Sequence, residues 1–152
     1  MMKRACVVLA LSITAMDQAI KALIRMLPVG GVFCEIPHIV SIARYMNTGA
    51  AFSLFAGQTA LVTVVSALLL ALIPLVFLRF MRVSRAGKLA FAALIGGGLG
   101  NLIDRLAWGS VTDYIRLLFI DFPVFNFADI AITVSVGIIL LQILTDRLEE
   151  RG

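Results

Sequence analysis

Long apolar runs, separated by shorter polar connections, dominate the sequence. Residues 59–78 contain no charged side chain, and residues 88–103 and 127–145 are nearly as apolar. A helix that crosses a lipid bilayer needs about 20 mostly apolar residues, whereas a buried helix of a soluble protein needs fewer. The pattern therefore predicts an integral membrane protein.

Four transmembrane helices are predicted, and together they form a single membrane domain over residues 1–152. The predicted spans are residues 5–27, 59–78, 88–106 and 126–146. The first span begins like a secretory signal, with basic residues before an apolar run. Because that run continues well past the length of such a signal, we expect a retained helix with polar residues in its outer half.

The connection between spans one and two, residues 28–58, is expected to contain a small β-rich subregion. Residues 32–45 favour strands, and Gly and Pro punctuate the rest of the connection. The predicted fold class is thus an all-α membrane protein of four helices with a small extracytoplasmic sheet. The apolar residues Ala50 to Phe55 of this connection are expected to lie on the membrane and brace a substrate.

Basic residues flank the apolar runs. The 152-residue chain has 13 Lys and Arg against 9 Asp and Glu, which gives a net charge of +4. Most of the bases lie at the N-terminus (Lys3, Arg4), in one short connection (Arg79, Arg82, Arg85, Lys88) and at the C-terminus (Arg147, Arg151). Such clusters face the cytoplasm. We therefore predict that both termini lie inside and both long connections outside, and we expect no nucleic-acid partner.

The polar residues of the apolar segments gather near the outer ends of the predicted spans. They are Asp17, Lys21, Asn101, Asp104, Arg105, Asp113, Asn126 and Asp129. On span three, Asn101 and Asp104 share a helix face, and on span four Asn126 and Asp129 do the same. The two helices are expected to present these side chains toward each other, while the inner halves of the spans remain apolar.

Several of these residues also have a simpler interpretation. Asp17 and Lys21 are spaced i, i+4 and could form an ion pair that only stabilises the fold. Asn101 and Asn126 could be hydrogen-bonding links between helices as readily as parts of a site. Arg105 could extend toward the lipid headgroups.

Asp113 and Asp129 fit a purely structural interpretation least well. Neither has a basic residue at helical spacing on its own segment, and an ionised carboxylate at the edge of an apolar helix is costly. The sequence has no Ser–His arrangement, and its one histidine, His38, has no neighbours with the spacing of a metal site. Two close carboxylates share one proton, so that one can activate water while the other polarises a carbonyl.

Two classes of function other than an enzyme are compatible with polar residues in apolar helices. A proton or ion transporter would need polar groups through the full depth of the bundle. A non-catalytic assembly protein would not need two unpaired carboxylates at one depth. From the residues alone, a peptidase is favoured only slightly over a transporter.

Five segments, taken in order, resemble the motifs of a known family. They are Asp17 to Lys21 (DQAIK), Asn47 to Phe52 (NTGAAF), Gly96 to Arg105 (GGGLGNLIDR), Val111 to Ile115 (VTDYI) and Phe125 to Ile132 (FNFADIAI). The sequence is similar along its whole length to lipoprotein signal peptidase, also called signal peptidase II. These proteins are bacterial membrane aspartic peptidases with four spans.

The resemblance implies a role for each matching residue. Asp113 and Asp129 would be the catalytic pair. Polar support or substrate binding would come from Asn47, Asn101, Asp104, Arg105 and Asn126, and structural stabilisation from Asp17 and Lys21. Tyr114 stands where Phe is expected more often.

It also implies a substrate and a location. The substrate would be a prolipoprotein whose cysteine carries a diacylglyceryl group, cut just before that cysteine without a metal or cofactor. We expect a monomer in the bacterial cytoplasmic membrane, in contact with membrane lipid, with its active site near the outer leaflet.

Overall fold

Four long helices and one small sheet make up the part of the chain that the computed structural model describes. That part comprises residues 2–49, 57–80 and 84–149, and it excludes the side chains of residues 76–80 and 146–149. The helices are α1 (Met2–Arg25), α2 (Thr59–Phe80), α3 (Arg85–Trp108) and α4 (Phe127–Glu149). The strands are β1 (Val32–Ile36), β2 (Val40–Asn47) and β3 (Val111–Leu117). The predicted patch at Ala50 to Phe55 lies outside the described residues, as do Arg82 and Arg151.

Three of the helices are long and apolar enough to cross a membrane: Met2–Arg25, Arg85–Trp108 and Phe127–Thr145. In the fourth, the part with described side chains forms a shorter apolar helix, Thr59–Leu75. The whole of α2 has 22 residues, and at a rise of about 1.5 Å per residue it would match a hydrocarbon core of about 30 Å. Because only three of the helices meet the length for a span over their described side chains, the four-span count stays a prediction.

The distribution of apolar side chains is the inverse of that in a soluble protein. The largest fully buried side chains are polar: Lys21, Asn126, Asp17, Asp104 and Ser135. Large apolar side chains lie on the outside: Leu68 on α2 is 54% exposed, and Leu141 on α4 is 65% exposed. Such an exterior is stable against lipid tails.

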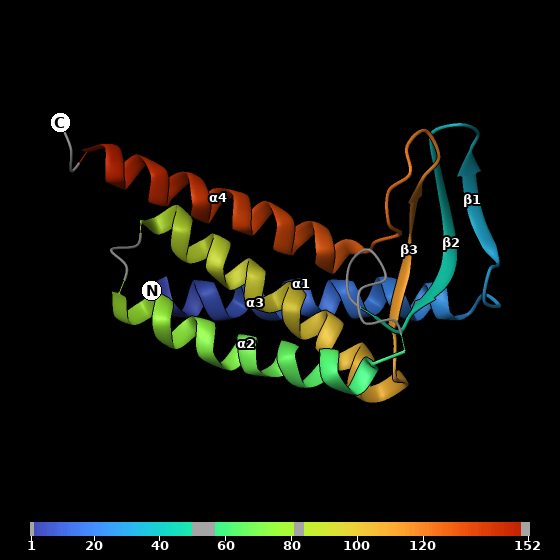
Figure 1. The fold of residues 1–152 in the computed structure, drawn as a ribbon, viewed down its shortest axis with the longest axis horizontal. Coiled ribbons are helices and arrows are strands. Elements are labelled where there is room, and N and C mark those ends of the chain that lie inside the picture. Colours follow the sequence, from blue (N-terminus) through green and yellow to red (C-terminus); the bar gives the residue numbers. More distant parts are fainter. Residues whose placement is uncertain (1, 50–56, 81–83, 150–152) are drawn as a thin grey trace.

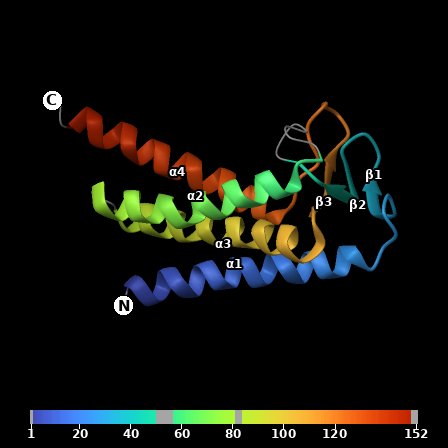
Figure 2. The same ribbon diagram turned by 60° about the horizontal axis from the view of Figure 1, so that its bottom comes forward.

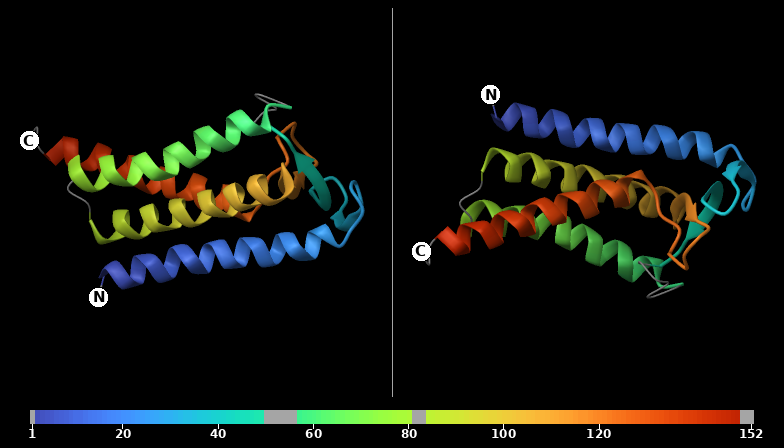
Figure 3. Two further views of the ribbon diagram at one scale, coloured as in Figure 1. Left: turned by 90° about the horizontal axis from the view of Figure 1, so that it is seen from below. Right: turned by 90° about the horizontal axis from the view of Figure 1, so that it is seen from above.

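Helix α3 lies in the middle of the bundle, in contact with each of the other three helices (Figures 2 and 3). Its glycines permit this packing. A Cβ at Gly96 would lie 2.6 Å from the backbone oxygen of Ala10 in α1, and one at Gly97 would lie 2.7 Å from that of Ala128 in α4. Small residues at such crossings let helix backbones approach closely. The close approach brings the polar ends of α1, α3 and α4 together.

The sheet is antiparallel, with strand order β1-β2-β3. It lies at one end of the bundle, with its strands running across the helix direction, and both termini lie at the opposite end (Figure 1). The predicted β-rich subregion between α1 and α2 supplies β1 and β2, but β3 comes from the connection between α3 and α4. In the β2–β3 ladder Asp113 pairs with Tyr45, so the third strand carries a predicted site residue into the sheet.

Candidate active site

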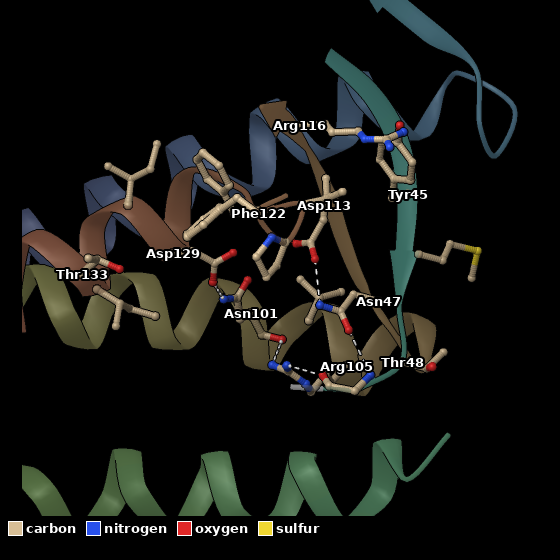
Figure 4. A pocket seen from close by; sticks show the side chains of 18 of the residues that line it. Tyr45, Asn47, Thr48, Asn101, Arg105, Asp113, Arg116, Phe122, Asp129 and Thr133 are labelled. Carbon is tan, nitrogen blue, oxygen red and sulfur yellow. Dashed lines mark hydrogen bonds between the residues drawn. The ribbon is translucent and has the colours of Figure 1, made fainter. Parts of the chain in front are cut away.

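A cleft of about 1110 Å³ lies where the ends of α3 and α4 meet the sheet (Figure 4). Its polar lining includes Asn47, Asn101, Arg105, Asp113 and Asp129. Its apolar lining includes Phe122, Pro123, Val124, Ile130 and Val134. Asp121, an exposed residue, also lines the cleft. The cleft thus combines three carboxylates, those of Asp113, Asp129 and the exposed Asp121, with an apolar surface.

Asp113 is the more deeply buried of the two carboxylates, at 2% exposure. Asn47 Nδ2 donates to its Oδ2 at 2.8 Å, and Asn126 Nδ2 donates to its Oδ1 at 2.7 Å. Burial raises the pKa of Asp113 from 3.8 to about 6, and the nearby charge of Asp129 adds to the rise, while the two amide donors oppose it. Asp113 therefore binds a proton far more readily than an ordinary aspartate.

Asp129 lies in the first turn of α4 and is half-buried. Asn126 and Asp129 cap this helix reciprocally: Asn126 Oδ1 accepts from the Asp129 N–H at 3.0 Å, and Asp129 Oδ2 accepts from the Asn126 N–H at 3.1 Å. The other carboxylate oxygen, Oδ1, accepts from Asn101 Nδ2 at 2.8 Å. These bonds account for an aspartate at the start of an apolar helix.

Asn126 connects the two carboxylates. Its Nδ2 donates to Asp113, and it also donates to Asn101 Oδ1 at 3.1 Å, while Asn101 in turn donates to Asp129. Both asparagines link helices, as one interpretation of the sequence expects, and both contact the carboxylates, as the other expects. One hydrogen-bonded chain therefore orders the whole polar side of the cleft.

Arg105 lies in the lining of the cleft rather than extending away from it (Figure 4). Its Nη2 donates to the backbone oxygen of Gly49 at 3.2 Å and its Nη1 to that of Asn101 at 3.4 Å. Its Nε is buried without a hydrogen-bond partner. Among the described residues it forms no ion pair, and each Nη has a second N–H that can donate to a ligand's carbonyl oxygen.

A second polar cluster lies behind the cleft. Lys21 Nζ is 2.8 Å from Asp17 Oδ2 and 3.7 Å from Asp104 Oδ2, and all three side chains are fully buried. Arg25 Nη1 pairs with Asp104 Oδ1 at 3.0 Å. The expected Asp17–Lys21 ion pair is thus present, within a cluster of two acids and two bases whose formal charges cancel.

Asp104 supports the sheet and does not line the cleft. Its Oδ2 accepts from the backbone N–H of Thr112 at 2.8 Å, and its Oδ1 accepts from Gln18 Nε2 at 3.0 Å. The bond to Thr112 fixes β3 one residue before Asp113. Asp104 therefore determines where the strand lies rather than contacting the cleft.

Three residues of this region were missed by the sequence analysis. Gln18 and Arg25 bind Asp104, and Tyr114 accepts the Phe127 N–H at 3.0 Å through its hydroxyl oxygen. Burial raises the pKa of Tyr114 to about 12, so its hydroxyl stays protonated. Arg25 follows Lys21 at the i+4 position, and this spacing is a signal that could have revealed it.

The described residues include no group of three or more His, Cys, Asp or Glu side chains that could hold a metal ion. The arrangement combines the carboxylates of Asp113 and Asp129 with amide donors and the guanidinium of Arg105. Chemically, such a set can hold a shared proton, activate a water molecule and bind a carbonyl oxygen.

Comparisons with known proteins agree with one another. Residues 9–145 match the family described as signal peptidase (SPase) II. The lipoprotein signal peptidase of Streptococcus pneumoniae is 37% identical over 150 residues, which cover 97% of this chain and 98% of that protein. The lipoprotein signal peptidase of Shouchella clausii is 36% identical over 145 residues, or 95% of each chain.

Solved structures show the same fold. One, described as a bacterial membrane enzyme, has a TM-score of 0.85 and 29% sequence identity, and it covers 94% of this chain and 89% of its own. A second structure with the same description has a TM-score of 0.82 and 30% identity, and it covers 93% and 94% of the two chains.

Proposed function

The chain belongs to the signal peptidase II family, and on that premise we propose that it is an aspartic endopeptidase that acts through Asp113 and Asp129. Family membership makes it a membrane peptidase that processes lipoprotein signal peptides. The observation that carries the proposal is the hydrogen-bonded chain through Asn126 and Asn101, which joins two carboxylates at one cleft.

The pair works with a single shared proton. The ionised carboxylate takes a proton from water as the water oxygen attacks the scissile carbonyl carbon, and the protonated carboxyl transfers its proton to the carbonyl oxygen. In the second half of the reaction, the carboxyl that took a proton from water gives it to the amide nitrogen. The other carboxylate takes a proton from a hydroxyl group of the tetrahedral intermediate. The C–N bond then breaks, and the pair returns to its starting state. The raised pKa of Asp113, about 6, supports the assignment of the shared proton to this residue.

The substrate is a prolipoprotein with a diacylglyceryl group on its cysteine, and the bond cut is the one just before that cysteine. The cleft supports such a substrate because Ile130 and Val134 both line it and are 41% and 56% exposed on α4. Its apolar lining is therefore continuous with the surface that faces lipid. A lipid-anchored chain can enter sideways from the bilayer without leaving it.

Polar residues of the cleft hold the peptide and the pair. Arg105, through its second Nη hydrogens, and Asn47 are available to bind backbone carbonyl oxygens near the scissile bond. Asn101 and Asn126 orient the carboxylates, and Asp104 fixes β3. Asp17 and Lys21 hold the helices together beneath the site.

In the proposed topology, four spans place both termini in the cytoplasm and the sheet outside. The cleft then lies near the outer leaflet of the bacterial cytoplasmic membrane, where a lipidated precursor presents its cysteine. The protein works as a monomer, without a cofactor. Apart from Ser135 within α4, the buried polar residues among the described ones lie in the sheet, beside it or at the sheet ends of the helices. This location supports the site over a transport path, because a transport path would need polar groups at every depth.

The direct test is cleavage by the purified protein. It is incubated with a diacylglyceryl-modified prolipoprotein, and the products are identified by mass. We expect the signal peptide and a mature chain that begins at the lipidated cysteine. Cleavage elsewhere, or equal cleavage of the unlipidated precursor, would contradict the proposed substrate.

A further inference from the structure

Lys21 is a fully buried ammonium group with three acceptors around it. Two are carboxylates, Asp17 Oδ2 at 2.8 Å and Asp104 Oδ2 at 3.7 Å. The third is the amide oxygen of Asn101, which accepts a hydrogen bond at 2.8 Å. The carboxylates neutralise the charge of Lys21. Charge neutralisation does not explain why its third contact is an amide that belongs to the cleft.

The contact with Lys21 fixes which way the Asn101 amide faces. Asn101 Oδ1 accepts from both Lys21 Nζ and Asn126 Nδ2, at 2.8 and 3.1 Å. Its Nδ2 therefore faces the opposite way and donates to Asp129 Oδ1 at 2.8 Å. A flipped amide would set its N–H groups against an ammonium group and another amide donor, and would remove the donor to Asp129 Oδ1.

We propose that Lys21 is a positioning residue for Asp129, acting through the amide of Asn101. The inference rests on the proposed role of Asp129 in peptide cleavage. It assigns Lys21 a role beyond holding helices together, because its ammonium group sets the orientation of the Asn101 amide, which donates to Asp129.

The same chain makes the two carboxylates unequal. Hydrogen bonds in a chain polarise one another, so a cation at one end strengthens the N–H donor at the other. Asp129 receives such a chain through Asn101, whereas the donors of Asp113 are Asn47 and Asn126, and neither accepts from a cation. Lys21 therefore acts on the donor to Asp129 and not on the donors to Asp113. Asp129 is the member of the pair that accepts the proton from water.

The test removes the cation without leaving a buried charge unpaired. Lys21→Met alone would strand Asp17, so the informative variant is the double change Asp17→Asn/Lys21→Met, which removes both charges together. Its matched control is Asp17→Asn, which keeps Lys21 and also keeps an oxygen for the Ala128 N–H. Single-turnover cleavage of a lipidated precursor is measured for both, with thermal stability measured in parallel.

Relative to Asp17→Asn, the double variant is expected to lose at least about tenfold in rate at saturating substrate. A group that itself transfers the proton contributes roughly a hundredfold or more, and Lys21 acts on such a group only through Asn101. The half-saturating substrate concentration should change by less than about threefold, because substrate contacts are intact. A merely structural role would lower the folded fraction and leave the rate per folded molecule unchanged.

A second pair of variants tests the route through the amide. With Asn101→Ala added to both proteins, the difference in rate should shrink to less than about threefold, because residues that act through one another are not additive. The inference would be overturned if the rate difference stayed the same in the presence of Asn101→Ala. It would also be overturned if Asp17→Asn and Asp17→Asn/Lys21→Met cleaved at equal rates without Asn101→Ala. If the wild type and Asp17→Asn both fail to cleave the precursor, the proposed function fails, and this inference fails with it.

Discussion

Asp17 caps the helix that carries Asp129, although it lies on a different helix. Its Oδ1 accepts the backbone N–H of Ala128 at 3.1 Å, and its Oδ2 pairs with Lys21 at 2.8 Å. The first turn of α4 is thereby tied to α1. A helix end buried without such a partner would leave an unsatisfied donor.

Asp17→Ala is expected to reduce the amount of folded protein more than the chemistry of each folded molecule. The change leaves Lys21 buried and removes its nearest carboxylate, which typically costs about 3–5 kcal/mol. Thermal unfolding in detergent and turnover normalised to folded protein check this. Wild-type stability together with abolished turnover would contradict it.

Gly97→Ala should destabilise the protein and displace α4, because the new methyl group would lie 2.7 Å from the Ala128 backbone oxygen and 3.0 Å from Ile132. Overpacking of this kind costs about 1–3 kcal/mol. The matched control is Gly98→Ala, whose methyl group meets only the flexible side chain of Leu70. Thermal unfolding of both variants is the measurement, and equal stability of the two would contradict the packing account.

The raised pKa of Asp113 predicts a pH dependence of stability. In the folded state Asp113 holds its proton up to about pH 6, whereas its pKa in the unfolded chain is 3.8. This proton therefore stabilises the folded protein, and the stabilisation is complete below the unfolded-chain pKa. The stabilisation is lost as the pH rises through about 6. Asp113→Asn should abolish the effect. The unfolding temperature of the wild type should therefore rise relative to that of the variant between about pH 7 and about pH 5, and a pH-independent difference would contradict the assignment.

Local pattern was enough to predict the helices and the two carboxylates. Run length identifies spans in lipid, and an aspartate such as Asp129 stands out against an apolar segment. The i, i+3 spacing of Asn126 and Asp129 predicted a shared helix face, and it also fits the reciprocal cap, which was not predicted. The predicted helix bounds differ from the observed ones by three residues or fewer at each end.

Partners distant along the chain could not be predicted in this way. Strand β3 pairs with β2, although α2 and α3 lie between the two strands in the sequence. No local signal therefore indicates this pairing. Asp104 has its partners on α1 and β3, and Tyr114 caps α4, for the same reason. These contacts depend on helix packing, which the glycines of α3 permit but do not specify.

The proposed topology can be tested with single cysteines in a variant that lacks Cys6 and Cys34. Ser84 is the N-cap residue of α3, at the helix end near the termini, and Gln58 precedes α2 at the sheet end; both are exposed. With both termini in the cytoplasm, Gln58→Cys should react with a membrane-impermeant thiol reagent in intact cells, and Ser84→Cys should resist it. The reverse pattern would place the cleft on the wrong side for a lipidated precursor.

The central claim is that Asp113 and Asp129 act as one unit. Asp113→Asn and Asp129→Asn keep the side-chain shape but cannot share or pass a proton, so each variant should fold and still bind the lipidated precursor. Glu35→Gln is the matched control, because Glu35 is an exposed carboxylate on β1 outside the cleft. It should cleave like the wild type.

Single-turnover cleavage of the lipidated precursor, measured beside binding, tests this claim most directly. Each single Asn variant should lose at least about a hundredfold in rate, and the double variant should be little slower than either one, because members of a catalytic unit are not additive. Near-normal turnover in either single variant, with binding intact, would contradict the two-carboxylate mechanism.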